Sequence, residues 1–428
     1  MLLYLFCNKS HYENVPFEIP ESWAWCKLDN LAFYKKGPFG SSLTKSMFIP
    51  DNGDAYKVYE QKNAIQKDSN LGHYFISGEK FQELKGFEVL PNDIIVSCAG
   101  TIGETYIMPS DIRSGIINQA LMIIRLHNID ITPFYLLYFD FILKNEAGKD
   151  GKGTAIKNIP PFDILKNYWI PLPPLAEQDR IIKEVALWQC LIDSIDGNIE
   201  DIFKLSKKTK SKILDLAISG KLVPQDPNDE PAIELLKRIN PDFKPCDNSH
   251  YENLPENWCL AKVKDVFVIN PRNKAEDNTI AGFIPMTLID DGYSNTFSYE
   301  KRKWEAIKTG FTHFADGDVA VAEISPCLEN RKSIVLRDLP NGIGAGTTEL
   351  HVFRSSVVSP EYALYFFKSE YFISRCVGTF NGVVGQQRVG KNIIEEIQIP
   401  IPPINEQTKI VSTIETIFTQ LNTITAEL

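Results

Sequence analysis

The chain has 428 residues, of which 43% are hydrophobic and 23% are charged, a composition typical of a soluble globular protein with about two to three domains. No apolar run approaches the ~20 residues of a membrane span, and residues 1–7 are too short for a signal peptide. The net charge of −10 argues against nucleic-acid binding over the whole surface but leaves local basic faces open. The eight cysteines form no C-x-x-C pair and no metal spacing with the six histidines, so we expect reduced cysteines, no metal and a cytoplasmic protein.

The chain contains one series of landmarks twice. S-H-Y-E-N at 10–14 returns at 249–253, and P-E-x-W at 20–23 returns at 255–258. A proline followed by aromatic residues at helical spacing occurs at 133–139 and 360–366, and I-P-x-P-P-x-x-E-Q occurs at 170–178 and 399–407. Because the order is kept, we predict two related domains of about 160 residues.

The interior of each domain has the pattern of a β-rich structure. Residues 87–97 and 314–322 each predict a strand, a turn and a strand, and residues 116–126 and 349–353 predict further strands. The sequence therefore predicts an α+β protein, with two mixed α/β domains whose sheets are mostly antiparallel and which long helices separate. The predicted segments are a short N-terminal segment at 1–15, a first domain at 16–175, a helix at 176–222, a proline-rich linker at 223–254 that contains a short helix at 232–239, a second domain at 255–403 and a second, short helix at 404–428.

Each I-P-x-P-P motif predicts the end of an extended segment and the start of a long helix, because prolines disfavour helix before them and Glu or Gln suits a first turn. The first helix would span ~60 Å. Steps of four and three residues give an apolar seam in both helices, which predicts that they pack on each other as a coiled coil. A single amphipathic helix on a globular core is the alternative. The seam residues are Ile181, Val185, Trp188, Ile192, Ile195, Ile199 and Ile202 in the first helix, and Ile410, Ile414, Ile417, Leu421 and Ile424 in the second.

Two motifs are similar to known catalytic signatures, but each departs from the required pattern. Residues 385–391 match most of a phosphate-binding P-loop, but Asn392 stands where the metal-binding hydroxyl belongs. Residues 158–162 are similar to a methyltransferase motif, but Ile159 separates the polar residue from the prolines. We therefore expect no catalysis by this chain. A methyltransferase or nuclease with an unrecognised site is the alternative.

Two similar domains of diverged sequence on a rigid helix suit the recognition of two unlike elements on one polymer. Loops rich in cationic, hydroxyl and amide side chains can contact phosphates and read base edges. For each loop alone, an ordinary solvated turn is the alternative. The candidate DNA-binding residues are Lys35, Lys36, Ser41, Ser42, Lys45, Lys149, Lys152 and Lys157 in the first domain, and Asn270, Arg272, Asn273, Lys274, Arg331, Lys332, Thr347, Thr348, Gln386, Gln387 and Arg388 in the second.

The landmarks resemble those of the specificity (S) subunit of type I restriction–modification systems, the HsdS family. The resemblance rests on K-G-P-F-G-S-S-L at 36–43, on S-G-K-L-V-P-Q-D-P-N-D-E-P-A at 219–232, on the paired I-P-x-P-P motifs, and on I-S-P-C-L-E-N-R-K with G-T-T-E-L-H-V-F-R. It implies two target-recognition domains that each read one half of a bipartite double-stranded DNA target, and an antiparallel coiled coil that sets the spacing.

The resemblance also implies partners. The family's S subunit has no active site and binds no cofactor. It docks two methylation (M) subunits, which use S-adenosylmethionine, and through the complex it engages restriction (R) subunits, which need ATP and Mg²⁺.

The two ends depart from the family pattern. The chain begins nine residues before Ser10, and the second helix stops at Leu428 where the first continues for another twenty residues. We therefore expect an incomplete pseudo-twofold arrangement in which one M-subunit site is weakened. A truncated or silent specificity copy, which binds M subunits without forming an active complex, is the alternative function.

Overall fold

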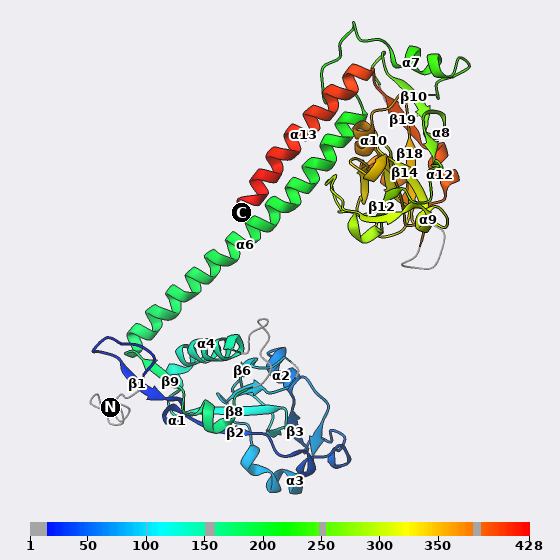
Figure 1. Ribbon diagram of the computed structural model, residues 1–428. Helices are drawn as coiled ribbons and strands as arrows, with labels where there is room; N and C mark the ends of the chain where they lie inside the picture. Colours follow the sequence, from blue (N-terminus) through cyan, green and yellow to red (C-terminus); the bar gives the residue numbers. More distant parts are fainter. Residues whose placement is uncertain (1–14, 100, 150–158, 248–253, 380–386) are drawn as a thin grey trace. The chain divides into compact units, whose positions relative to one another are not determined.

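The computed structural model describes residues 15–99, 101–149, 159–247, 254–379 and 387–428 (Figure 1). The chain divides into a first unit, Met1–Ser194, and a second unit, Ile195–Leu428. Helix α6, Leu175–Ile218, begins in the first unit and ends in the second. In the described ranges no helix has the length and hydropathy needed to cross a bilayer.

The first unit is built from two small sheets and the helices that cover them. A four-stranded sheet has the order β2-β8-β5-β6 and a three-stranded sheet the order β4-β3-β7, and only the β3–β7 pair is parallel. The elements are β1 (Ala24–Lys27), α1 (Leu28–Leu31), β2 (Ala32–Lys36), β3 (Tyr56–Tyr59), α2 (Gln61–Ile65), β4 (Phe75–Ile76), α3 (Gly78–Glu83), β5 (Ile94–Ser97), β6 (Thr105–Ile107), β7 (Gly115–Ile117), β8 (Leu121–Leu126), α4 (Thr132–Lys149), α5 (Phe162–Leu165) and β9 (Trp169–Leu172).

The second unit repeats this plan. Its sheets have the orders β11-β18-β15-β16 and β13-β12-β17-β14, and only β12–β17 is parallel. The predicted mostly antiparallel sheets are therefore confirmed in both units. The elements are α7 (Ala232–Ile239), β10 (Cys259–Lys262), α8 (Val263–Val266), β11 (Val268–Ile269), β12 (Ile280–Ile284), β13 (Glu300–Lys303), α9 (Trp304–Ile307), β14 (Thr312–Ala315), β15 (Val319–Ala322), β16 (Ser333–Val335), β17 (Ile343–Gly346), β18 (Leu350–Arg354), α10 (Pro360–Phe367), α11 (Glu370–Val377), α12 (Lys391–Glu396), β19 (Gln398–Ile401) and α13 (Ile404–Ala426).

Each unit also contains a two-stranded antiparallel ribbon that leads into its long helix. In the first ribbon Ala24 pairs with Leu172, and in the second Cys259 pairs with Ile401. A proline lies inside the later strand of each ribbon, a position that is tolerated because a two-stranded ribbon has open edges. The two P-P motifs then end the strands, and α6 and α13 begin at Leu175 and Ile404.

An ion pair between a partly exposed arginine and a buried aspartate holds the four-stranded sheet of each unit. Arg125 donates through Nε and Nη2 to the Asp93 carboxylate at 2.7 Å, and Arg354 donates to Asp318 at 2.7 and 2.8 Å. Both carboxylates are 1% exposed and also accept a backbone N–H three residues upstream at 2.7 Å. This bidentate arrangement links the arginine of one strand to the turn that precedes its neighbour.

Two predicted segments differ in the structure. The helix predicted to reach Leu222 ends at Ile218, because Gly220 adopts φ +70° and closes the helix with a left-handed residue. In place of a strand at 87–90, a 3-10 turn ends at Phe87 and Glu88 makes an isolated bridge to Ile116. A turn at Asn92, with φ 66°, follows immediately and shortens the extended segment.

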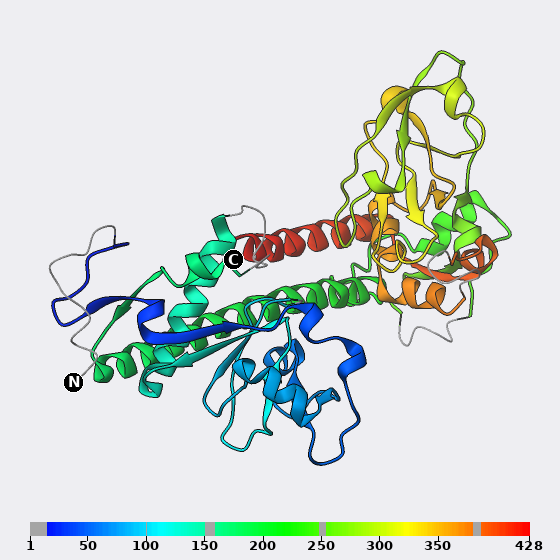
Figure 2. The ribbon, with the colours of Figure 1, turned by 90° about the horizontal axis from the view of Figure 1, so that it is seen from below.

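Within the second unit, the end of α6 and α13 lie side by side and run in opposite directions (Figures 1 and 2). Their apolar faces enter one core, to which Ile213 and Ala217 contribute from α6 and Ile410, Ile414 and Phe418 from α13. Lys210 on α6 donates to the Asn422 side chain at 2.5 Å.

The predicted seam of α6 is partly buried at its two ends and exposed in its middle. Ile181 is partly buried against the core of the first unit, and Val185 is also partly buried. Near the other end Ile199 and Ile202 are partly buried, as are Ile417 and Leu421, whereas Ile424 is exposed. The middle positions Trp188, Ile192 and Ile195 are more than half exposed.

Candidate nucleic-acid interface

The first unit presents its candidate residues on a loop that follows β2. Gly37 begins this loop against the backbone of the 118–119 turn, where a Cβ would lie 1.8 Å from the Asn118 carbonyl oxygen. Only glycine fits such a close approach. The loop therefore leaves the sheet at a fixed place and exposes Lys36, Ser41 and Lys45 to solvent, whereas Ser42 is half-buried.

Two exposed side chains at this loop, Phe39 and Gln119, were not among the predicted contact residues. Phe39 at its tip is 86% exposed, and an aromatic face of this kind can stack on a base or fill a groove. Gln119 is exposed, and its Oε1 lies 3.9 Å from the position of a Cβ on Gly40. Amide side chains suit adenine edges, so the N-Q pair after β7 is a signal that could have been read.

The other first-unit candidates have different surroundings. Lys35 is half-buried, with its ammonium 4.8 Å from the centre of the Phe87 ring, a cation–π contact that holds the end of β2. Lys149 is the last residue of α4, and its side chain is not described. Lys152 and Lys157 lie outside the described residues.

In the second unit the structure brings two predicted loops together. The loop after β17 carries Thr347 and the exposed Thr348, and Arg388 donates to Glu349 beside them at 3.3 Å. The 387–389 segment runs along the end of β15, where Ser325 N donates to the Gln387 carbonyl and Val389 N to that of Glu323. We call Thr347, Thr348, Gln387 and Arg388 the second-unit loop cluster. Gln386 lies outside the described residues.

A carboxylate network underlies this cluster. Glu323 lies 2.8 Å from His351 Nε2 and 3.6 Å from Arg388 Nε. Arg388 nevertheless keeps a half-exposed side chain, so its guanidinium can reach a phosphate or a guanine edge. The two glutamates preposition this cation and compete with an anionic ligand for it.

Four predicted contact residues of the second unit form intramolecular bonds instead of facing solvent. Asn270, at φ 55°, bonds both backbone groups of Val352 through its own N–H and side-chain oxygen. Asn273 donates to the Phe314 carbonyl at 2.6 Å, and Lys332 donates to two backbone carbonyls. These partners give the side chains a role in positioning loops.

Arg331 is the most enclosed of these cations. It donates to Glu370 at 2.6 Å and to the Lys368 carbonyl at 3.0 Å, and it lies over the Tyr293 ring. The Lys368 ammonium beneath it is buried and donates to the carbonyls of Gly292 and Arg331. Burial, with a smaller contribution from Arg331, lowers the pKa of Lys368 to about 7. Arg272 and Lys274 remain exposed on the preceding loop.

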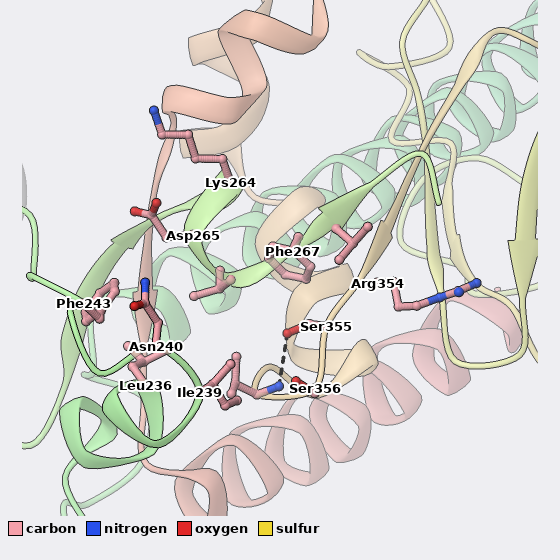
Figure 3. A pocket seen from close by; sticks show the side chains of 13 residues that line it. Leu236, Ile239, Asn240, Phe243, Lys264, Asp265, Phe267, Arg354, Ser355 and Ser356 are labelled. Atoms are coloured by element: carbon pink, nitrogen blue, oxygen red, sulfur yellow. Dashed lines mark hydrogen bonds between the residues drawn. The ribbon is translucent and has the colours of Figure 1, made fainter. Parts of the chain in front are cut away.

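A cavity of about 480 Å³ lies elsewhere in the second unit (Figure 3). Leu236, Phe243 and Phe267 form apolar walls, and Lys264 and Arg354 stand at the polar rim. The lining contains none of the predicted DNA-contacting residues. Among the residues that the structure describes, no three His, Cys, Asp or Glu side chains gather in a way that could hold a metal ion.

Comparison with known proteins identifies relatives of this arrangement. A family model described as "Type I restriction modification DNA specificity domain" matches residues 20–185 and 255–428, most of the chain. The type I restriction enzyme EcoEI specificity subunit of Escherichia coli is 40% identical over 265 residues, covering 56% of this chain and 44% of that protein. The EcoAI specificity subunit of Escherichia coli is 42% identical over 224 residues, covering 48% of this chain and 38% of that protein. The chain thus spans less than half the length of either relative.

A solved structure has the same fold. The crystal structure of the HsdS subunit from Thermoanaerobacter tengcongensis superimposes with a TM-score of 0.52 at 16% identity, covering 96% of this chain and 93% of that one. The match agrees with the predicted architecture of two domains with antiparallel sheets and a long central helix.

Proposed function

This chain belongs to the family of type I restriction modification DNA specificity domains, and from that premise we propose that it is the sequence-recognition subunit of a type I restriction–modification complex. Each unit reads one half of a bipartite double-stranded DNA target. The α6 helix, with the coil that α13 forms against its end, sets the distance between the halves.

One observation carries this proposal. The two units share the strand order of one four-stranded sheet, the ribbon register and an arginine paired with a buried aspartate, whereas the loops around them present different side chains. A common framework with diverged loops supports the reading of two unlike half-sites. The exposed Lys36, Ser41 and Gln119 in the first unit and Thr348 and Arg388 in the second are polar groups that can contact phosphates and base edges.

The chain acts in this proposal without chemistry of its own. M subunits supply S-adenosylmethionine-dependent methylation of adenine, R subunits supply cleavage that uses ATP and Mg²⁺, and the complex works in the cytoplasm. The net charge of −10 supports a complex in which partner subunits contribute to DNA binding, because this chain gains little from non-specific electrostatic attraction to DNA. Specific loops and basic partner surfaces would provide the binding energy.

Mapping of modified adenines tests the proposal. Cells that express this chain with its M subunits should methylate a two-part motif that disappears when this gene is deleted. Purified chain alone, supplied with S-adenosylmethionine or with Mg²⁺ and DNA, should show no turnover. Loss of no motif on deletion would sink the proposal, and turnover by the isolated chain would favour an enzyme.

Loop variants test the assignment of one half-site to each unit. Lys36→Ala with Gln119→Ala should weaken or relax one half of the motif, and Thr348→Ala with Arg388→Ala should affect only the other, each base contact being worth about 1–3 kcal/mol. Lys204→Ala is the matched control, because Lys204 lies on the exposed surface of α6. Equal loss in both halves from a variant of one unit would contradict the assignment.

A further inference from the structure

In the second unit, the linker segment that follows α6 fills a site formed by the ribbon and the first turn of α13. The Gln225 side chain accepts a hydrogen bond from Trp258 Nε1 at 3.2 Å and donates to Glu406 Oε1 at 2.7 Å. Trp258 Nε1 also donates to Glu406 Oε2 at 3.0 Å. The three side chains form a closed polar network around an indole that is only 8% exposed.

Two further contacts fix the same linker. A Cβ on Gly220 would lie 2.5 Å from Cγ of Pro255, so the segment starts with its backbone against this proline. Asp229, 8% exposed, accepts from Lys409 at 3.3 Å. Glycine, amide and carboxylate therefore each have a dedicated partner.

The first unit contains the same partners at the same places. Trp23 directly precedes β1 as Trp258 precedes β10, and the two ribbons share one register. Pro20 stands three residues before its tryptophan, as in the second unit. Glu177 is the third residue of α6, as Glu406 is of α13, and Arg180 takes the place of Lys409.

In the described part of the first unit these partners have no segment to bind. The indole nitrogen of Trp23 is buried and has no hydrogen-bond partner there, although a buried donor of this kind costs about 1–3 kcal/mol. Beside it opens a cavity of about 610 Å³, lined by Val15, Phe17, Ile19, Pro20, Trp23 and Trp25. Glu177 is half-buried and Arg180 is exposed.

We propose that this cavity and the start of α6 form a docking site for an extended segment of a partner polypeptide with the chemistry of residues 219–231. Its glycine packs on Pro20, its aliphatic side chains enter the apolar cavity, its amide bridges Trp23 Nε1 and Glu177, and its carboxylate faces Arg180. The site is separate from the DNA-reading loops and does not depend on the proposed function.

The occupant is a partner chain, because a second copy of this chain holds its own linker in its second unit. Charge complementarity supports the assignment. The segment carries three carboxylates and one lysine, and a cation stands at the same position of both helices, as Arg180 and Lys409.

Binding of a synthetic peptide with the sequence of residues 219–231 to the full chain tests the site. Fluorescence anisotropy of the labelled peptide should show saturable binding that Trp23→Phe weakens about tenfold, the effect expected for loss of a buried hydrogen bond to an amide. A peptide with Gln225→Ala should lose a similar factor against the unaltered chain. Trp188→Phe is the matched control, since Trp188 is 58% exposed on α6.

A charge exchange keeps the test decisive if Trp23→Phe fails to fold. A peptide with Asp229→Lys should bind the unaltered chain about fivefold more weakly, and Arg180→Glu should restore its binding, the size expected for a partly exposed ion pair. Absence of saturable binding would overturn the proposal. So would binding that Trp258→Phe abolishes and Trp23→Phe leaves unchanged, which would place the peptide in the second unit. Self-association of the chain that Trp23→Phe removes would show a second copy as the occupant and overturn the assignment to a partner.

Discussion

The two units share one framework of strands and helices but differ in the side chains of their loops and in the contacts that support them. Both hold a strand arginine on a buried aspartate, and both pair a ribbon in one register before a P-P motif. They differ where the framework does not dictate the residue. The second unit buries Lys368 at the position where the matched helix of the first unit carries Phe141, which is 52% exposed. The comparison teaches that internal bonds define this fold, while loops and supporting contacts are free to diverge.

The two units also differ in the hydrogen-bond partners that neighbouring segments give to matching side chains. Trp258 has two hydrogen-bond partners from outside its ribbon, whereas Trp23 has none among the described residues. The loops show the same contrast. The cations of the first unit's loop after β2 face solvent, whereas Arg331 and Lys332 in the second unit are occupied by carbonyls and a carboxylate.

The buried ion pairs should give the largest effect, because each carboxylate is almost fully buried. Asp93→Ala and Asp318→Ala each leave a partly exposed arginine and a backbone N–H without their acceptor. The loss of these charge-assisted hydrogen bonds should cost about 3 kcal/mol of unfolding free energy in each variant. Hydrogen exchange should show the loss only in the unit that carries the change. Glu300→Ala, which breaks the exposed pair with Arg302, is the control and should change stability by under ~0.5 kcal/mol. Equal loosening of both units would contradict their independence.

Replacing a seam isoleucine by alanine should cost more stability where the seam is buried than where it is exposed. Ile414→Ala removes a fully buried side chain from the α6–α13 core and should cost about 2–4 kcal/mol in urea unfolding. Ile195→Ala, at a position 57% exposed, should change the isolated chain by under ~0.5 kcal/mol. A large cost at Ile195 would show that the middle of the seam is covered in solution.

Two glycines of the α6 region should give effects of opposite sign. Gly220→Ala places a Cβ 2.5 Å from Pro255 at φ +70° and should destabilise the second unit by about 2 kcal/mol. Gly197→Ala lies within the helix with nothing within 4 Å and should stabilise it by about 0.5–1 kcal/mol. Thermal unfolding measures both. A stabilising Gly220→Ala would mean that the end of α6 moves freely.

Lys368 should make the stability of the second unit depend on pH. Its pKa is about 7 in the folded chain and 10.5 in an unfolded one, so between these values the unfolded state binds more protons. The free energy of unfolding should therefore rise between about pH 7 and 10.5, by at most ~1.4 kcal/mol per pH unit. Below pH 7 the destabilisation caused by burying the Lys368 ammonium is complete.

Urea unfolding of Lys368→Met beside the unaltered chain isolates this contribution, because the other titrating groups cancel in the difference. Phe141→Met at the matched position of the first unit should leave the pH profile unchanged. Parallel profiles for the unaltered chain and Lys368→Met would show that Lys368 keeps its ammonium charged across this range.

Much of the architecture was readable from the sequence. The repeated landmarks predicted two related units, and the P-P motifs placed the starts of α6 and α13 within one residue, because proline chemistry acts locally. Residues 314–322 formed the predicted strand, turn and strand, since a G-D turn between apolar runs is a local signal. The α7 helix at Ala232–Ile239 also matches its predicted bounds.

Tertiary structure decided which polar residues remain available. The sequence could not separate Asn270 and Arg331 from Thr348 and Arg388, because a polar loop residue is bonded or exposed according to which backbone comes near it. The importance of Phe39 and Gln119 likewise depends on the close approach of Gly37 to the 118–119 turn. The helical seam follows from spacing alone, but its burial at Ile414 and exposure at Ile195 follow from which helix lies beside it. Periodicity determines what a face can bury, and only packing determines what covers it.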